Sequence, residues 1–140
     1  MRKKYKYRSN CPINFTQEIL GDKWSMLIIR DLMFAGKRHY GEFLKSDEKI
    51  STNILADRLG KLEHSELISK TIDKNNLSKN IYSLTSKGID LMPILIEMIS
   101  WGLNNNDKTM VPPEFLKGLQ TDKIKFMKEL KRAVSKAHGV

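Results

Sequence analysis

Cysteine and long apolar runs are the two features that this 140-residue chain most clearly lacks. Its single cysteine, Cys11, excludes an internal disulfide and a cysteine-rich zinc site, and permits a disulfide only between two chains. The longest apolar stretches, 26–29 and 91–96, fall well short of the roughly 18 residues that a transmembrane helix requires. No apolar segment follows the basic residues 2–8, so we expect no signal peptide. The sequence therefore favours a cytoplasmic protein with no membrane partner.

Groups suited to catalysis or metal binding are also few. The three histidines, His39, His64 and His138, are scattered, and none has a cysteine or a second histidine at a useful spacing. The sequence has no glycine-rich phosphate loop. We therefore expect no enzyme, no cofactor and no metal site. Trp24 and Trp101 are expected in the core, and the alternative is that they line an effector pocket.

The charge of the chain is unevenly distributed, although its net value is +9. Residues 1–9 hold five basic side chains and no acid, residues 10–105 hold 12 of each sign, and residues 106–140 hold eight basic and four acidic ones. A basic chain suggests a nucleic-acid partner, but basic tails are more often only solvated. We divide the chain into a basic arm at 1–10, a folded domain at 11–103 and a helical extension at 104–140.

Hydrophobic spacing predicts a mainly helical domain. Pro12 is well placed to begin a first helix, and the apolar segment 23–34 predicts a second helix that is buried on most sides. A short helix is expected at 40–44 and a turn at 46–49. Ser51 then caps a further helix.

Leu55, Leu59 and Leu62 give the helix capped by Ser51 one buried stripe. The runs 67–73 and 80–84 have strand character, so they predict a hairpin with a long polar loop at 74–79.

Thr85 is expected to cap a helix that Gly88 and Pro93 perturb and that continues to Leu103. Residues 89–103 are apolar nearly all round, and a helix without a polar face is buried on all sides. In a chain of this length, such burial most simply requires a partner subunit, which predicts a homodimer. Beyond it, the segment 121–137, recapped by Thr121, is expected to form an amphipathic helix that packs on the dimer.

This order of helices and hairpin is typical of a winged helix-turn-helix. In that fold the second helix of the motif presents its N-terminal turn to the DNA major groove. Small hydrogen-bonding or methyl-bearing side chains suit base edges there, and Ser51, Thr52, Asn53 and Ala56 provide them. The alternative is that Ser51, Thr52 and Asn53 form only a cap and a solvated first turn.

Basic residues flank the helix that Ser51 caps, and they are candidates for phosphate contacts. Lys74 and Lys79 belong to the predicted wing loop. Lys37, Arg38 and His39 come just before the short helix. Together with Ser51, Thr52, Asn53 and Ala56, they predict an interface with double-stranded DNA.

A series of short motifs then follows in one order: Cys11-Pro12, Gly21–Trp24, Gly36–Phe43, Ile50-Ser51, Leu59–Glu63, Ser65–Ile68, Tyr82–Gly88 and Trp101-Gly102. In these motifs the sequence resembles the HxlR-type winged-helix regulators of bacteria and archaea, relatives of the MarR group. The resemblance implies a homodimeric, sequence-specific transcriptional regulator, most often a repressor, and we expect it to be associated with the nucleoid.

The resemblance also implies which surfaces meet the partner and the DNA. The first helix and the long helix after the wing form the dimer interface, so the residues expected there are Ile13, Leu95, Ile96, Ile99 and Trp101. Asp57 comes close to the DNA side. It either accepts a hydrogen bond from a cytosine amino group or forms a salt bridge with Arg58 or Lys61.

Cys11 is a candidate redox sensor. It stands at a helix N-terminus, near Lys6 and Arg8, and both features favour the reactive thiolate. Some members of the family sense oxidants or electrophiles through the cysteine before this proline. The alternative is a small buried residue that fills space at the subunit interface.

Two other function classes stay open from the sequence. One is a winged-helix protein-interaction module without DNA binding. The other is a peripheral membrane protein that uses the basic amphipathic helix at 121–137.

Overall fold

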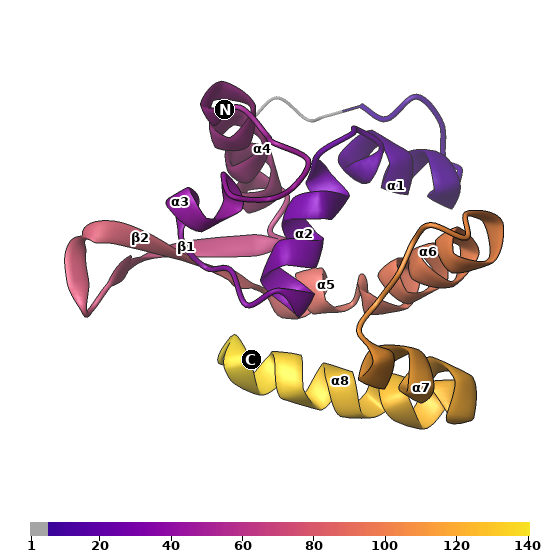
Figure 1. Cartoon of the computed structure of the whole chain (residues 1–140). Helices are drawn as coiled ribbons and strands as arrows, with labels where there is room; N and C mark the ends of the chain where they lie inside the picture. The colour runs from indigo at the N-terminus through magenta and orange to yellow at the C-terminus, as the bar shows by residue number, and fades with distance from the viewer. Residues whose placement is uncertain (1–5) are drawn as a thin grey trace.

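The computed structural model describes residues 6–140, so the first five residues of the predicted basic arm lie outside it. As the sequence predicts, these residues form a mainly helical fold with one two-stranded antiparallel hairpin. Figure 1 shows the elements in the order α1 (Pro12–Leu20), α2 (Ser25–Phe34), α3 (Tyr40–Phe43), α4 (Thr52–His64), β1 (Ile68–Asp73), β2 (Asn76–Leu84), α5 (Ser86–Ile89), α6 (Met92–Asn105), α7 (Pro113–Thr121) and α8 (Lys123–Ala137). No helix within residues 6–140 is long and apolar enough to cross a membrane.

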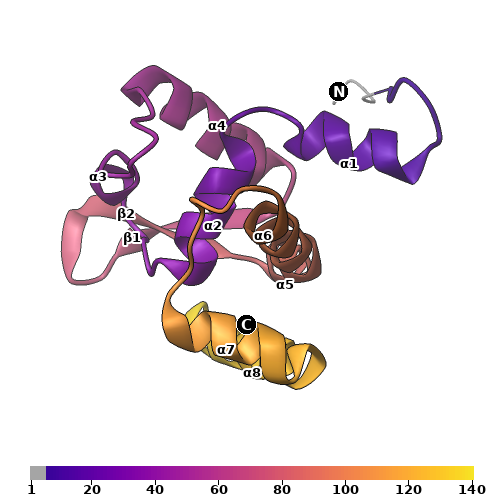
Figure 2. The ribbon, with the colours of Figure 1, turned by 45° about the vertical axis from the view of Figure 1, so that its right-hand side comes forward.

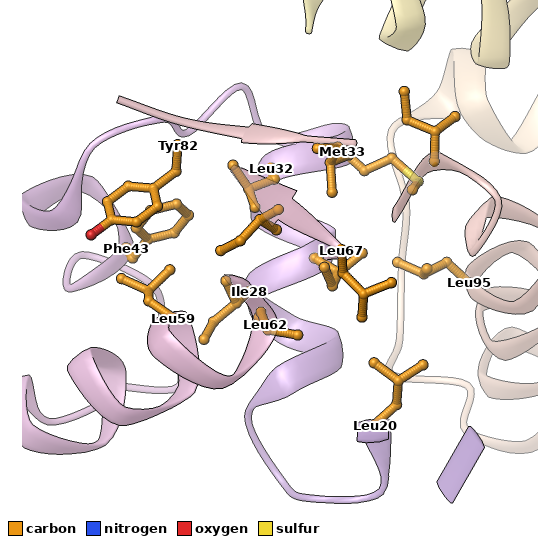
Figure 3. Packing of buried hydrophobic residues seen from close by; sticks show 14 of the residues in the cluster. Leu20, Ile28, Leu32, Met33, Phe43, Leu59, Leu62, Leu67, Tyr82 and Leu95 are labelled. Carbon is orange, nitrogen blue, oxygen red and sulfur yellow. The ribbon is translucent and has the colours of Figure 1, made fainter. Parts of the chain in front are cut away.

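The hydrophobic core surrounds α2, which is the central helix of the domain. Ile28 of α2 lies close to Leu59 and Leu62 of α4, as Figure 3 shows, and all three side chains are buried. Full burial of each such side chain contributes about 1.5–3 kcal/mol. The predicted stripe of α4 is therefore confirmed as the face that holds this helix against α2.

The hairpin is longer than the sequence predicts. Strand β2 already begins at Asn76, which pairs with Asp73, so only Lys74 and Asn75 form the turn. The predicted loop at 74–79 is therefore wrong. Both faces of this part of the hairpin are exposed, and backbone pairing there does not require apolar side chains.

The predicted long helix after the hairpin is broken into α5 and α6. Thr85 does cap α5, because its Oγ1 accepts a hydrogen bond from the backbone N–H of Gly88 at 3.1 Å. A Cβ at Gly88 would lie 2.2 Å from the carbonyl oxygen of Leu67, so only glycine allows this approach to β1. Pro93 stands in the first turn of α6, where its missing N–H costs no hydrogen bond.

Helix α6 is buried on one side only within residues 6–140, so the all-round burial that the sequence predicts through a partner subunit stays a prediction. Leu95 and Ile96 are buried in the chain's own core. Ile94, Met98 and Trp101 follow at intervals of four and three residues and are exposed, Trp101 to 70%. These three side chains form an apolar stripe that residues 6–140 leave uncovered.

The extension at 104–140 folds back onto the domain as two helices. Figure 2 shows α7 and α8 side by side beneath α2, α5 and α6. Asp122, and not the predicted Thr121, caps α8, because its Oδ1 accepts from the backbone N–H of Lys125 at 3.1 Å. Val134 of α8 is buried against the domain core. The amphipathic helix is thus observed, and within this chain it packs on its own subunit.

His138 fastens the end of α8 to the domain. Its Nδ1 accepts a hydrogen bond from the backbone N–H of Leu84, and its Nε2 donates to the carbonyl oxygen of Leu32, both at 2.9 Å. Since Nδ1 must accept, the imidazole is neutral. Burial, the largest cause, lowers the pKa of His138, with a smaller contribution in the same direction from the charge of Arg38.

Candidate nucleic-acid interface

The N-terminal half of α4 presents an exposed polar face. Ser51 caps the helix, with its Oγ accepting a hydrogen bond from the backbone N–H of Ile54 at 3.4 Å. The other four residues predicted to read bases, Thr52, Asn53, Ala56 and Asp57, are all exposed. Because the opposite stripe is buried, these side chains share the outward side of one rigid helix.

Short helix α3 sets the position of this face. The hydroxyl of Tyr40 donates to the carbonyl oxygen of Thr52 at 2.7 Å, and Phe43 is buried. Between the helices, Lys49 has a φ of 58°, a left-handed conformation that turns the chain toward Ile50. The Tyr40 contact was not predictable from the sequence, because a tyrosine near a helix start has no fixed partner.

An ion pair fixes the middle of α4 to the start of α2. Nε of Arg58 donates to Oδ2 of Asp22 at 2.8 Å. Burial raises the pKa of Asp22, but hydrogen bonds from Ser25, Trp24 and Arg58 outweigh it and lower the pKa to about 2. Asp22 thus stays charged and holds α4 against α2.

Asp57 forms salt bridges within α4. It pairs with Arg58, and Lys61 Nζ lies 3.3 Å from its Oδ2. The salt-bridge alternative is thus observed in the chain alone, and a hydrogen bond from a cytosine amino group to Asp57 stays a prediction. The Lys61 hydrogen bond is the largest of the causes that lower the pKa of Asp57.

The wing carries the two predicted lysines at its exposed end. Lys74 lies in the turn and Lys79 on β2, and both side chains are exposed. Oδ1 of Asp73 accepts from the backbone N–H of Asn75 at 2.8 Å and closes the turn. Figure 1 shows this end of the hairpin on the same side of the molecule as α3, away from α1.

Lys37 and His39 have roles inside the subunit that the phosphate prediction did not include. Lys37 Nζ donates to Ser46 at 2.6 Å and lies 3.4 Å from buried Asp31. His39 bonds Glu42 and Asp73 through its two ring nitrogens.

Arg38 is likewise engaged within the chain. Its guanidinium donates to the carbonyl oxygens of Tyr82 and Ala137 and to the hydroxyl of Ser83. Lys37, Arg38 and His39 therefore have structural roles within the chain, and their contact with phosphate stays a prediction.

Cys11 is exposed and immediately precedes α1 as its N-cap residue. The nearby guanidinium of Arg8 donates to Oδ1 of Asn14 at 2.9 Å and pairs with Glu18. Cys11 is therefore not buried within residues 6–140 of one chain, and the alternative that it fills space at a subunit interface stays open.

The residues predicted for a dimer interface separate into two groups. Ile13 of α1 is 77% exposed and Trp101 is also exposed, while Ile99 is half-buried. Leu95 and Ile96 are core residues of this chain and cannot meet a partner, which corrects their assignment. Ile94 and Met98, which the prediction did not name, are exposed at helical spacing with Trp101.

The described residues contain no cluster of three or more histidine, cysteine or acidic side chains placed to hold a metal ion.

Comparison with known proteins identifies the family of the chain. Residues 19–110 match the model of the HxlR-like helix-turn-helix family. The uncharacterized HTH-type transcriptional regulator YybR of Bacillus subtilis (strain 168) is 31% identical over 103 residues, which cover 74% of this chain and 82% of YybR.

Two solved structures are also similar. PA1607, described as a putative transcription factor, has a TM-score of 0.67 and 36% identity, covering 74% of this chain and 73% of its own. The redox regulator HypR in its oxidized form has a TM-score of 0.62 and 31% identity, covering 69% of this chain and 98% of its own. The chain therefore belongs to the HxlR-like helix-turn-helix family of transcriptional regulators.

Proposed function

We propose that the protein is a homodimeric regulator that binds specific DNA sequences through α4 and the wing. The observation that carries this proposal is the exposed polar face of α4, held in place by Tyr40 and Arg58. A helix supported in this way can enter the major groove without losing its contacts to the domain. DNA binding also places the protein at the nucleoid.

Asn53 is the residue best suited to read a base. Its exposed amide can both donate and accept, which matches the N6 and N7 edge of adenine. Thr52 and Ala56 add methyl groups that can contact a thymine methyl. Because Asp57 is neutralised by Arg58 and Lys61, its charge opposes the approach of phosphates less than a free carboxylate would.

The wing lysines provide affinity in this proposal. Lys74 and Lys79 are exposed cations at the end of a hairpin, and each suits a phosphate oxygen beside the groove. Such contacts carry no sequence information and release counterions, so they make binding dependent on salt concentration.

The dimer of the proposal uses the stripe Ile94, Met98 and Trp101 together with Ile13. Isolated exposed apolar residues are normal, but a stripe at helical spacing on a helix as apolar as α6 is better explained by a covering partner. A two-fold dimer would place its two α4 helices in successive major grooves, about one helical turn apart.

Cys11 is proposed as the residue through which an oxidant or electrophile acts. Its exposure and its position beside Ile13, in the proposed interface, support this role. HypR, a relative with the same fold, is described as a redox regulator.

Selection from a random duplex library tests the proposal as a whole. The protein should enrich a two-fold symmetric site, and hydroxyl-radical footprinting should show two protected segments about one helical turn apart. Recovery of no common sequence at low salt would contradict sequence-specific binding and would favour a protein-interaction module.

A further inference from the structure

A large apolar cavity lies between the domain and the extension. Its volume is about 930 Å³, and Met33, Phe34, Ile99, Leu103, Phe115 and Leu130 are among its lining residues. These residues come from α2, α6, α7 and α8, which Figure 2 shows facing one another. The volume falls in the range of small-molecule sites. Neither Trp24 nor Trp101 lines this cavity, so it is not the effector pocket that the sequence offered as an alternative for these two residues.

Two of the lining residues are arginines, Arg30 and Arg38. Arg30 is neutralised, because it pairs with Asp31 and Glu48. Arg38 donates to three acceptors, and all of them are uncharged: the carbonyl oxygens of Tyr82, at 2.5 Å, and of Ala137, at 3.0 Å, and the hydroxyl of Ser83.

No carboxylate in residues 6–140 forms an ion pair with the guanidinium of Arg38. Glu42 accepts from the backbone N–H of Arg38 at 3.2 Å and not from the guanidinium. Burial lowers the pKa of Arg38 by more than the charge of Glu42 raises it. A partly desolvated cation that lacks an anion is unfavourable, and a ligand anion would relieve it.

His138 borders the same part of the cavity, but it offers no free group. Its two ring nitrogens are committed to Leu84 and Leu32. A guanidinium has five N–H donors. Since the three hydrogen bonds of Arg38 use three of them, the remaining two can meet an oxygen of a bound anion.

We propose that this cavity binds a small molecule that carries one anionic group, such as a carboxylate, on an apolar body. The anion lies against Arg38, and the apolar body lies among Met33, Phe34, Ile99 and Phe115. Thioether and aromatic side chains adapt to ligands of varied shape, so apolar contacts give affinity while Arg38 selects for charge. The site is separate from the proposed DNA contacts and does not depend on them.

A matched pair of fluorescent probes tests the site on the full-length protein. The anionic probe 1-anilinonaphthalene-8-sulfonate and the neutral N-phenyl-1-naphthylamine share an apolar body and differ in the sulfonate. We expect one anionic probe to bind per chain, with an affinity about tenfold or more above that of the neutral probe, because a charge-assisted hydrogen bond forms.

Three variants separate charge from shape. Arg38→Met should reduce the affinity for the anionic probe to that for the neutral one, whereas Lys128→Met, which removes an exposed charge on α8, should change neither. Ala133→Trp should weaken both probes, because Ala133 lines the cavity and a larger side chain fills it. Near-ultraviolet circular dichroism verifies folding. If Arg38→Met does not fold, two results still test the proposal. One is the ratio of the two probe affinities in the wild type, and the other is the affinity of both probes for Ala133→Trp.

Equal affinity for the two probes in the wild type would overturn an anionic ligand. Binding that Ala133→Trp leaves intact would place the probes elsewhere and overturn the site. Loss of binding as the protein concentration rises through dimer formation would show that a second copy fills the cavity, and would also overturn the proposal.

Discussion

Nε2 of His39 lies 2.9 Å from Oδ2 of Asp73, so the residue before α3 is joined to the last residue of β1. Nδ1 of the same ring lies 2.8 Å from Oε1 of Glu42. Both nitrogens can donate to these carboxylates only when the imidazole is protonated. The hydrogen bond to Asp73, and after it the one to Glu42, raises the pKa of His39. The wing and α3 are therefore connected through a histidine charge.

This connection predicts a pH-dependent stability. Because the folded-state pKa lies above the ordinary value of 6.5, the stabilisation by His39 is fully present below pH 6.5 and is lost as the pH rises through the raised pKa. His39→Gln should therefore lower the urea midpoint at pH 5.5 and have less effect at pH 8.5. His64→Gln, at an exposed position, serves as the control. A His39→Gln effect that is constant across this range would contradict a charged bridge.

His138 should show the opposite dependence. Its folded-state pKa lies below 6.5, so its stabilisation is fully present above pH 6.5 and is lost as the pH falls toward the lowered pKa. At pH 8, His138→Ala should reduce the free energy of unfolding by about 1–3 kcal/mol, because Leu84 N–H and the Leu32 carbonyl lose their partner. Chemical denaturation at pH 8 and pH 5 measures this. No loss at pH 8 would mean that α8 does not depend on His138 for docking.

The proposed dimer predicts that a charge on the α6 stripe separates the subunits. Trp101→Asp should yield a folded monomer at micromolar concentration, because a carboxylate would be buried without a partner in the interface. Multi-angle light scattering gives the mass, and circular dichroism verifies the fold. Ile124→Asp, at a position on α8 that is 66% exposed, should leave the mass unchanged. A wild type that is itself monomeric at these concentrations would rule out the proposed dimer.

The sensor role of Cys11 predicts a variant that binds DNA but ignores oxidant. Cys11→Ser conserves shape and should retain the affinity for DNA, while diamide treatment should change the affinity of the wild type alone. Fluorescence anisotropy with and without diamide measures both. Since Cys11 is the one cysteine of the chain, the experiment needs no substitution of other cysteines. If the wild type binds DNA with unchanged affinity after its thiol has been shown to be oxidised, Cys11 is not a sensor.

The sequence was sufficient for features that depend on local spacing. Leu55, Leu59 and Leu62 predicted α4 and its buried side, because residues three and four apart share a helix face. The cap at Ser51 was confirmed for the same reason. The length of β2 was not predictable in this way, since exposed Asn76 joins the strand through its pairing with Asp73, beyond an irregularity in the register.

The partners of the basic residues before α3 could not be predicted, because they come from distant parts of the chain. Arg38 meets Ala137, 99 residues later, and His39 meets Asp73, 34 residues later. For a basic residue near a DNA-binding motif, the sequence does not show whether the side chain contacts a phosphate or forms a hydrogen bond within the protein. Docking of α8 depends on the same kind of long-range contact, through His138.

The most direct test of the proposal that α4 reads DNA is a titration of Asn53→Ala and Lys79→Ala on the selected duplex and on a scrambled one. Each titration is repeated at several salt concentrations. Asn53→Ala should cost about 1–3 kcal/mol per half-site on the selected duplex and little on the scrambled one. Lys79→Ala should weaken both duplexes alike and flatten the logarithmic salt dependence by about one unit per lost phosphate contact in each subunit. An Asn53→Ala variant that loses the same affinity on both duplexes would contradict sequence reading by α4.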